Sequence, residues 1–170
     1  MINLTDYIGH ELEIVNKNFF KSYFDLNAEG IPILSLRNTD FWGNHHEITG
    51  YGKVWEISKP SIWRSTLEVK EKNSATILAT FESTTFRNKG TITLPRGEKL
   101  LIVTHIWKSS YELQNELGTT LVLFKNKKWY SSTINLTIEK KSEVLDKYPF
   151  IIMLVFFTAL QRQNAAAAAV

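Results

Sequence analysis

The sequence predicts a mostly β fold: a closed antiparallel barrel of about twelve strands, in three repeated four-strand units, around a buried C-terminal hydrophobic helix. Two observations lead to this prediction. A hairpin pattern occurs three times, about 43 residues apart, and an apolar segment that belongs to no repeat ends the chain. The repeat predicts the barrel, and the apolar segment predicts what fills it.

The repeat is clearest in three stretches that each begin with an aromatic residue. They are FKSYFDLNAEGIPILSLRN from Phe20, WRSTLEVKEKNSATILATF from Trp63 and WKSSYELQNELGTTLVLFKN from Trp107. Side chains in the first part of each stretch alternate in polarity, which is the period of a strand with one face toward water. A polar turn and a second apolar run follow, so each copy predicts a β-hairpin. Further strands such as KVWEIS and KLLIVTH bring each unit to about four.

A repeat of 40 to 45 residues with four strands per unit also describes a propeller blade. Three blades fall below the usual minimum of four, and neither a Trp-Asp nor a Gly-His signature occurs at matching positions. Closing about twelve antiparallel strands into a barrel removes the exposed edges instead. The barrel is therefore the preferred fold.

Residues 142–170 read as a helix, with Ser142 as an N-terminal cap and Pro149 in a first turn. From Pro149 to Leu160 the segment is apolar on every side apart from Thr158, and such a helix must be buried all round. About 12 apolar residues make a helix roughly 18 Å long, whereas a bilayer needs about 20 residues. The length matches a barrel interior. The alternative is a tail anchor, in which Pro149–Val170 inserts into a membrane.

Length and composition predict one soluble domain spanning residues 1–170. A hydrophobic content of 44% is typical of a globular protein and argues against disorder. The chain has no cysteine, and its N-terminus lacks a signal-peptide pattern, so we expect a cytoplasmic protein. We also expect a monomer. The net charge is +3 and is uneven: residues 1–84 have 8 basic and 11 acidic side chains, residues 85–170 have 12 and 6. This asymmetry permits an anionic partner.

The stretch GNHHEITGYGK contains the residues most suggestive of chemistry. On a strand His45 and Glu47 share one face while His46 faces the other, so a metal site would need partners such as His10 or His105 brought close by folding. The GYGK sequence lacks the remaining glycines and the Lys-Ser/Thr ending of a phosphate loop. No nucleophile elbow occurs either. We expect no metal, no cofactor and no enzyme activity, with an enzyme or metal site at a barrel rim as an alternative.

The repeated aromatic-led hairpins, WKSSYELQNELGTTLVLFKN and FKSYFDLNAEGIPILSLRN, and the terminal KYPFIIMLVFFTAL resemble the tubby C-terminal-like superfamily, in the branch of the LURP-one-related proteins and phospholipid scramblases. The resemblance extends from about Leu4 to Leu160. It implies a twelve-stranded barrel around a central helix, and relatives linked to phosphoinositide binding or lipid movement. The chain departs from the scramblases in having neither lipidation cysteines nor an acidic calcium-binding segment.

Two basic turns with neighbouring aromatic residues are the predicted binding surface. The candidate residues are Lys125, Lys127 and Lys128 in FKNKKWY, and Arg87 and Lys89 in FRNKG. Basic groups beside aromatics suit an anionic membrane surface. The predicted function is a non-enzymatic binding or scaffold protein that contacts anionic phospholipid head groups and associates peripherally with a membrane; no nucleic acid partner is expected. The competing interpretation is that these lysines only keep the turns solvated.

Overall fold

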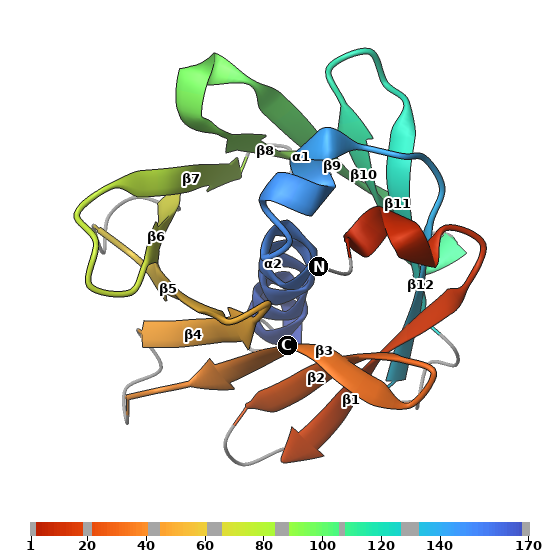
Figure 1. Ribbon diagram of the computed structural model, residues 1–170, viewed down its shortest axis with the longest axis horizontal. Helices are drawn as coiled ribbons and strands as arrows, with labels where there is room; N and C mark the ends of the chain where they lie inside the picture. Colours follow the sequence, from red (N-terminus) through yellow and green to blue (C-terminus); the bar gives the residue numbers. More distant parts are fainter. Residues whose placement is uncertain are drawn as a thin grey trace.

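The chain folds as a closed antiparallel β-barrel with a helix in its centre (Figure 1). A computed structural model describes residues 3–18, 22–40, 45–60, 66–83, 89–105, 108–126 and 133–167. Within these residues twelve strands each pair with their neighbours in the sequence, and the first pairs with the last. The predicted closed barrel of about twelve strands with a C-terminal helix is therefore confirmed.

The elements are numbered along the chain. The strands are β1 (Glu11–Asn18), β2 (Tyr23–Ala28), β3 (Ile31–Asn38), β4 (His45–Gly50), β5 (Lys53–Ser58), β6 (Thr66–Glu71), β7 (Ile77–Ser83), β8 (Lys89–Thr93), β9 (Lys99–His105), β10 (Ser110–Asn115), β11 (Thr120–Asn126) and β12 (Thr133–Ile138). The helices are the 3-10 helices η1 (Leu4–Tyr7) and η3 (Pro95–Gly97) and the α-helices α1 (Glu143–Lys147) and α2 (Ile151–Ala167).

The three predicted hairpins are β2–β3, β6–β7 and β10–β11. Their alternation has the predicted direction, because the apolar positions of β2, β6 and β10 are buried and their polar partners are mostly partly exposed. Each hairpin loses register at the same step of its pattern, directly after Leu26, Val69 and Leu113. Such an extra residue bends a strand and increases its twist. The three hairpins therefore curve at equivalent places.

Helix α2 occupies the barrel interior (Figure 1). Its residues up to Phe157, with the preceding Phe150, are at most 4% exposed, and Thr158 satisfies its hydroxyl by donating to the Val155 carbonyl at 2.8 Å. Burying one such aliphatic or aromatic side chain contributes roughly 1.5–3 kcal/mol. The inward side chains of the strands meet these residues, as in the contact between Phe24 and Phe156, whose ring centroids are 4.9 Å apart.

The segment predicted as one helix from residue 142 forms two helices. Tyr148, between α1 and α2, has φ −126° and ψ 62°, which is outside the helical region. The residue before a proline is disfavoured in the α conformation, and Pro149 follows Tyr148. The break lets α1 lie across one barrel end while α2 enters the interior.

The barrel end covered by η1 and α1 is called the plugged end. Asp146 of α1 accepts hydrogen bonds from the Thr5 backbone nitrogen at 2.9 Å and from the Thr5 hydroxyl at 2.6 Å. Leu4 and Leu145 beside this contact are fully buried. The hydrogen bonds therefore fix the N-terminal turn over the start of α2.

The other end is called the exit end, because the C-terminal part of α2 leaves the barrel there. Since all neighbouring strands are antiparallel, the odd-numbered strands finish at this end and the even-numbered strands begin there. Asn18 of β1 and Tyr23 of β2 are examples. Helix α2 changes from buried to exposed at Gln161, which marks the mouth of the barrel.

Candidate functional site

Two of the five predicted binding residues are described, and both lie at the exit end. Lys89 is the first residue of β8 and Lys125 the second-last of β11, and both are exposed. β8 and β11 are three strands apart in the barrel, which is roughly 15 Å along the sheet. Arg87, Lys127 and Lys128 lie outside the described residues.

Other basic side chains gather at the same end. Lys17 lies near the end of β1, Lys59 directly follows β5, and Lys108 precedes β10; all three are exposed. Within the described parts of the chain, these three and Lys125 form no ion pair. We call Lys17, Lys59, Lys89, Lys108, Lys125 and Arg162 the basic ring.

Few acidic groups offset this charge. Among described residues beyond the strands, or in the two strand positions nearest this end, the acidic side chains at the exit end are Asp40 and Glu82; Asp25, Glu47, Glu56, Glu68 and Glu112 lie one position further in. The same definition gives a mixed group of nearly balanced charge at the plugged end. Its acidic members are Asp6, Glu11, Glu29, Glu71, Glu98, Glu116, Glu139, Glu143 and Asp146, and its basic members are Lys53, Lys70, Lys72, Arg96, Lys99, Lys140, Lys141 and Lys147. Folding thus separates charge along the barrel axis.

Arg162 connects the end of α2 to the barrel wall. Its guanidinium donates to the Thr104 hydroxyl and to the Lys89 carbonyl, both at 3.2 Å, and lies 5.9 Å from the centre of the Phe81 ring. Partial burial lowers the pKa of Arg162. These contacts fix where the helix leaves the barrel.

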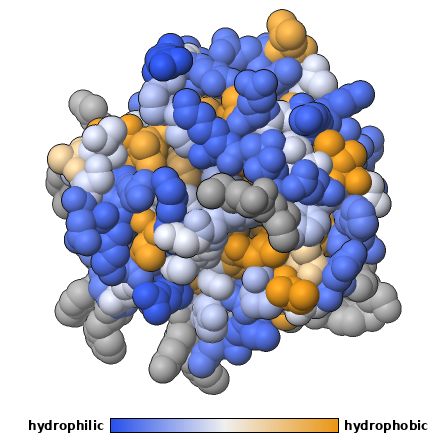
Figure 2. All heavy atoms as spheres, in the orientation of Figure 1, coloured by the Kyte–Doolittle hydropathy of each residue, from blue (hydrophilic) through white to orange (hydrophobic). Residues whose placement is uncertain are grey.

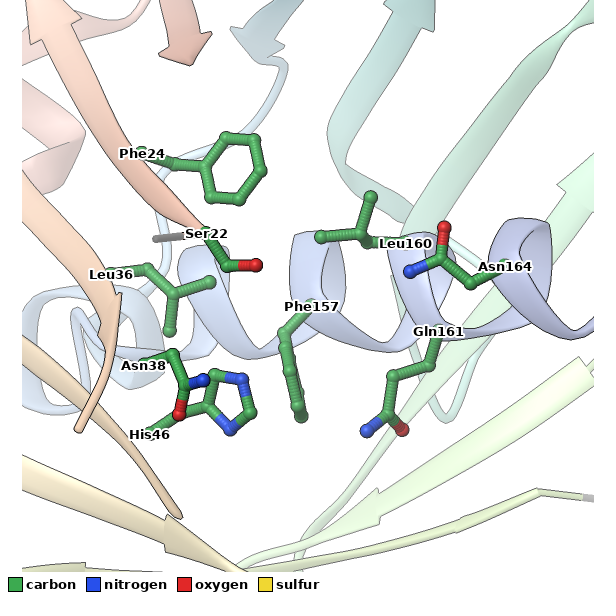
Figure 3. A pocket seen from close by; sticks show the side chains of 9 residues that line it. All are labelled: Ser22, Phe24, Leu36, Asn38, His46, Phe157, Leu160, Gln161 and Asn164. Carbon is green, nitrogen blue, oxygen red and sulfur yellow. The ribbon is translucent and has the colours of Figure 1, made fainter. Parts of the chain in front are cut away.

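A cavity of about 200 Å³ lies beside α2 at the exit end, between the helix and strands β2–β4 (Figure 3). Its polar lining consists of Ser22, Asn38, His46, Gln161 and Asn164, and its apolar lining of Phe24, Leu36, Phe157 and Leu160. In Figure 3 His46 and Asn38 lie on one side of the Phe157 ring and Gln161 on the other. Among the described residues, the lining contains amide, hydroxyl and imidazole groups and no carboxylate, lysine or arginine. We call it the amide cavity.

His46 is the titratable group of this cavity. Its ring packs against Phe157, with centroids 4.4 Å apart, and its side chain is largely buried. Burial lowers the pKa of His46 to about 4, against a smaller opposing effect of Asp40. At neutral pH the imidazole is therefore uncharged, with one nitrogen donating and the other accepting.

His45 and Glu47 lie on the outer face, as the strand alternation predicted. Glu47 accepts from Arg37 Nη2 and Lys72 Nζ, each at 2.6 Å, and these hydrogen bonds lower its pKa. The two histidines suggested as further metal ligands each contact a carboxylate instead. His10 lies 3.5 Å from Glu29, and His105 lies 3.0 Å from Glu112.

Across the described parts of the chain, no group of three histidine, cysteine or acidic side chains is placed to hold a metal ion.

The GYGK stretch is a hairpin turn between β4 and β5. Gly50 pairs with Lys53, and the two residues between them, Tyr51 and Gly52, have φ of 52° and 72°. Two consecutive positive φ angles are typical of a type I′ turn, which matches the twist of the flanking strands. The stretch therefore shapes a turn at the plugged end, where Lys53 pairs with Glu71 at 3.2 Å.

A larger open groove of about 530 Å³ lies on the outer face of β2–β5, lined by Tyr23, Ser35, Arg37, Asn38, Thr49 and Val54. Its cationic group, Arg37, is already held by Glu47. The groove thus offers little uncompensated charge to a ligand.

Among the described residues, the large hydrophobic side chains that are most exposed lie away from the basic ring. They are Ile8, Ile31, Ile77 and Leu117, and each lies at or next to a turn of the plugged end. In the orientation of Figure 1, the surface is mainly hydrophilic, with hydrophobic residues in separate small patches (Figure 2). In the part of the chain that the structure describes, the two barrel ends therefore differ in both charge and exposed apolar surface.

Comparison with known proteins supports the fold. No protein-family model and no curated protein matches the chain. The crystal structure of an Arabidopsis thaliana protein is similar, with a TM-score of 0.62 and 12% sequence identity, over 89% of this chain and 91% of that chain. At this identity the likeness shows a shared fold and nothing about activity.

Among the described residues, no helix is both long enough and apolar enough to cross a membrane. The predicted helical segment 142–170 contributes 17 residues to α2, of which those from Gln161 onward are polar or alanine.

Sequence reasoning missed most of the basic ring and the whole amide cavity. Lys17, Lys59 and Lys108 are far apart in the sequence, and none stands in a conspicuous cluster. A usable signal was present, because each lies at a junction from an odd-numbered to an even-numbered strand. Antiparallel pairing places all such junctions at one end of a barrel.

Proposed function

We propose that the protein is a non-enzymatic binding or scaffold protein of tubby-like fold, whose basic ring contacts the head groups of anionic phospholipids. The proposal extends the predicted turns at Lys89 and Lys125 to the whole exit end. It places the protein at the cytoplasmic face of a membrane, with the barrel axis pointing toward the lipid. Arg87, Lys127 and Lys128 belong to the same predicted surface by their positions in the sequence.

The observation that supports this most is the separation of charge along the barrel axis. Lys17, Lys108 and Lys125 are exposed, and no described acidic side chain pairs with them. Each lysine near an anionic lipid surface contributes about 1 kcal/mol. Several of them acting together give a salt-dependent attraction that orients the exit end toward the membrane.

The resemblance of the repeated hairpins to the tubby C-terminal-like superfamily supports the same proposal, because some relatives are linked to phosphoinositides or lipid movement. The Arabidopsis structure supports the barrel alone. The interior offers a further argument against a carrier that encloses its ligand, since α2 fills the barrel centre.

Charge reversal with a matched control tests the proposal. The triple variant Lys17→Glu, Lys108→Glu and Lys125→Glu reverses three exposed charges at the exit end. The control variant Lys99→Glu, Lys140→Glu and Lys141→Glu makes the same change in net charge at the plugged end. Binding is measured by sedimentation with vesicles of phosphatidylcholine and phosphatidylglycerol. The affinity for the vesicles should fall at least tenfold in the first variant and much less in the control.

Equal losses in the two variants would show an attraction governed by net charge, and unchanged sedimentation in both would remove the proposal. A second pair of variants tests the opposite orientation. If Ile31→Asp and Leu117→Asp abolish binding, the apolar turns of the plugged end contact the membrane and the orientation proposed here is wrong.

A further inference from the structure

We propose that the amide cavity binds the uncharged polyol part of an anionic lipid head group, of the size of a glycerol unit. The inference rests on the proposed function and goes beyond it, because the basic ring alone would accept any anionic lipid. The cavity would give the protein a preference among lipids of equal charge.

The lining supplies polar groups that have no internal partners. Within the described structure, four side chains make no hydrogen bond to another residue: Ser22, His46, Gln161 and Asn164. Asn38 uses its carbonyl oxygen to accept from the Asp40 backbone nitrogen at 3.2 Å, which leaves its amide protons available. His46 is buried and Ser22 partly buried, whereas Gln161 and Asn164 are exposed at the mouth of the cavity. Amides, hydroxyls and a neutral imidazole each both donate and accept. Polyol hydroxyls do the same.

The cavity favours an uncharged group. The Phe157 ring lies in the middle of the polar side chains, and Phe24, Leu36 and Leu160 complete the lining (Figure 3). A charge placed beside Phe157 would lose part of its hydration without gaining an opposite charge from the described lining residues. An ammonium or carboxylate is therefore disfavoured relative to a hydroxyl.

The size favours a small group. At about 30 Å³ for each water molecule, a cavity of this volume holds roughly seven waters, which leaves room for a three-carbon polyol together with bridging water. It is smaller than the ~300 Å³ or more of pockets that enclose drug-sized ligands.

The surroundings supply a place for the phosphate. The cavity lies against β2, β3 and β4, and the strands on either side of this group are β1 and β5. Lys17 lies near the exit end of β1 and Lys59 directly follows β5. Neighbouring strands are separated by about 4.8 Å, so β1 and β5 lie roughly 19 Å from each other, with the cavity between them. Each lysine therefore flanks one side of the cavity, and a phosphate on either side would meet one of them.

Vesicles of equal charge but different head group provide the test. Phosphatidylglycerol ends in a neutral glycerol, whereas phosphatidylserine carries the same net charge but ends in an ammonium and a carboxylate. At equal mole fractions in phosphatidylcholine, the protein should bind the phosphatidylglycerol vesicles roughly threefold to tenfold more tightly, the effect of one or two hydrogen bonds. The variants Gln161→Leu and His46→Phe should lose this preference but keep binding to both. Gln163→Leu, at an exposed position of α2 outside the cavity lining, is the control.

The outcomes separate the two proposals. Failure to bind either kind of vesicle overturns the proposed function. Equal binding to both, or a preference that persists in Gln161→Leu and His46→Phe, overturns the polyol site and leaves the basic ring standing. Titration with free glycerol 3-phosphate, followed by nuclear magnetic resonance at the Gln161 and Asn164 amides, tests the cavity without a membrane. Shifts at these amides that phosphoserine does not produce support the site, and their absence contradicts it. Circular dichroism establishes that each variant is folded, and Asn164→Leu replaces any that is not.

Discussion

Replacing His46 by phenylalanine should remove a large part of the pH dependence of stability. The His46 side chain is 8% exposed and packs on Phe157 inside the barrel mouth. Burial lowers its pKa from 6.5 to about 4. Between these two values the unfolded chain binds a proton that the folded chain does not, so the free energy of unfolding falls as the pH falls.

The size of the effect follows from the shift. A difference of about 2.5 pKa units at 1.36 kcal/mol per unit corresponds to about 3 kcal/mol, present above pH 6.5 and lost as the pH falls to about 4. His46→Phe keeps an aromatic ring against Phe157 but cannot take up a proton. We therefore expect the free energy of unfolding of the variant to fall by about 3 kcal/mol less than that of the natural protein over this pH range.

Urea unfolding at several pH values between 8 and about 4, followed by tryptophan fluorescence, measures the difference. Carboxylates such as Glu47 and Glu112, whose pKa values are lowered by hydrogen bonds, also lose stabilisation as the pH falls through and below their ordinary range. They are present in both proteins, so their contribution cancels. His10→Gln, at an exposed histidine of the plugged end, is the control. Parallel curves for His46→Phe and the natural protein would refute a buried neutral imidazole.

Three further predictions concern the fold. Deleting residues 145–170 removes the core that α2 provides, so the remaining chain should show no cooperative unfolding transition; a folded, soluble remainder would contradict the role given to α2. Asp146→Ala removes both hydrogen bonds from Thr5 and should cost about 2–4 kcal/mol in urea unfolding, with faster hydrogen exchange in η1, whereas unchanged exchange would show that η1 is held by other contacts. Gly50→Ala places a methyl group 2.5 Å from the Ile33 carbonyl oxygen and should lower stability by about 1–3 kcal/mol, unlike Ser58→Ala on the next strand, and equal stability would show that the β3–β4 contact can widen.

The repeat was readable from the sequence because strand periodicity is local. Leu26, Val69 and Leu113 occupy the same place in three similar patterns, and all three face the interior. Antiparallel neighbours joined by short turns leave few ways to arrange such hairpins. The terminal apolar segment was equally readable, since a helix without a polar face requires burial.

The interruption at Tyr148 was partly readable. Pro149 was predicted to lie in the first turn of a helix, but the break in the helix that it causes at Tyr148 was not predicted. Its consequence is structural, because the short helix α1 then covers the plugged end through Asp146 and Thr5. A contact between residues 141 positions apart has no local signal.

The candidate site was the part that the sequence left undetermined. Lys125 and Lys89 belong to turns that combine several basic residues with aromatic ones and were identified, whereas Lys17, Lys59 and Lys108 are single lysines outside such clusters. His46 was considered as a metal ligand, but its position beside Phe157 makes it an uncharged group in the lining of the amide cavity. Neither its neutrality nor its cavity follows from the residues next to it in the chain.

The sequence by itself determined the strands, their hairpin order and the need to bury the last helix, because these depend on periodicity and on apolar length. Only the tertiary structure decided which side chains share a barrel end. That decision depends on the alternating direction of all twelve described strands and on the depth to which α2 enters before Gln161 reaches water. The separation of charge between the two ends, and the uncharged cavity at one of them, are consequences of closure that no single segment of the chain contains.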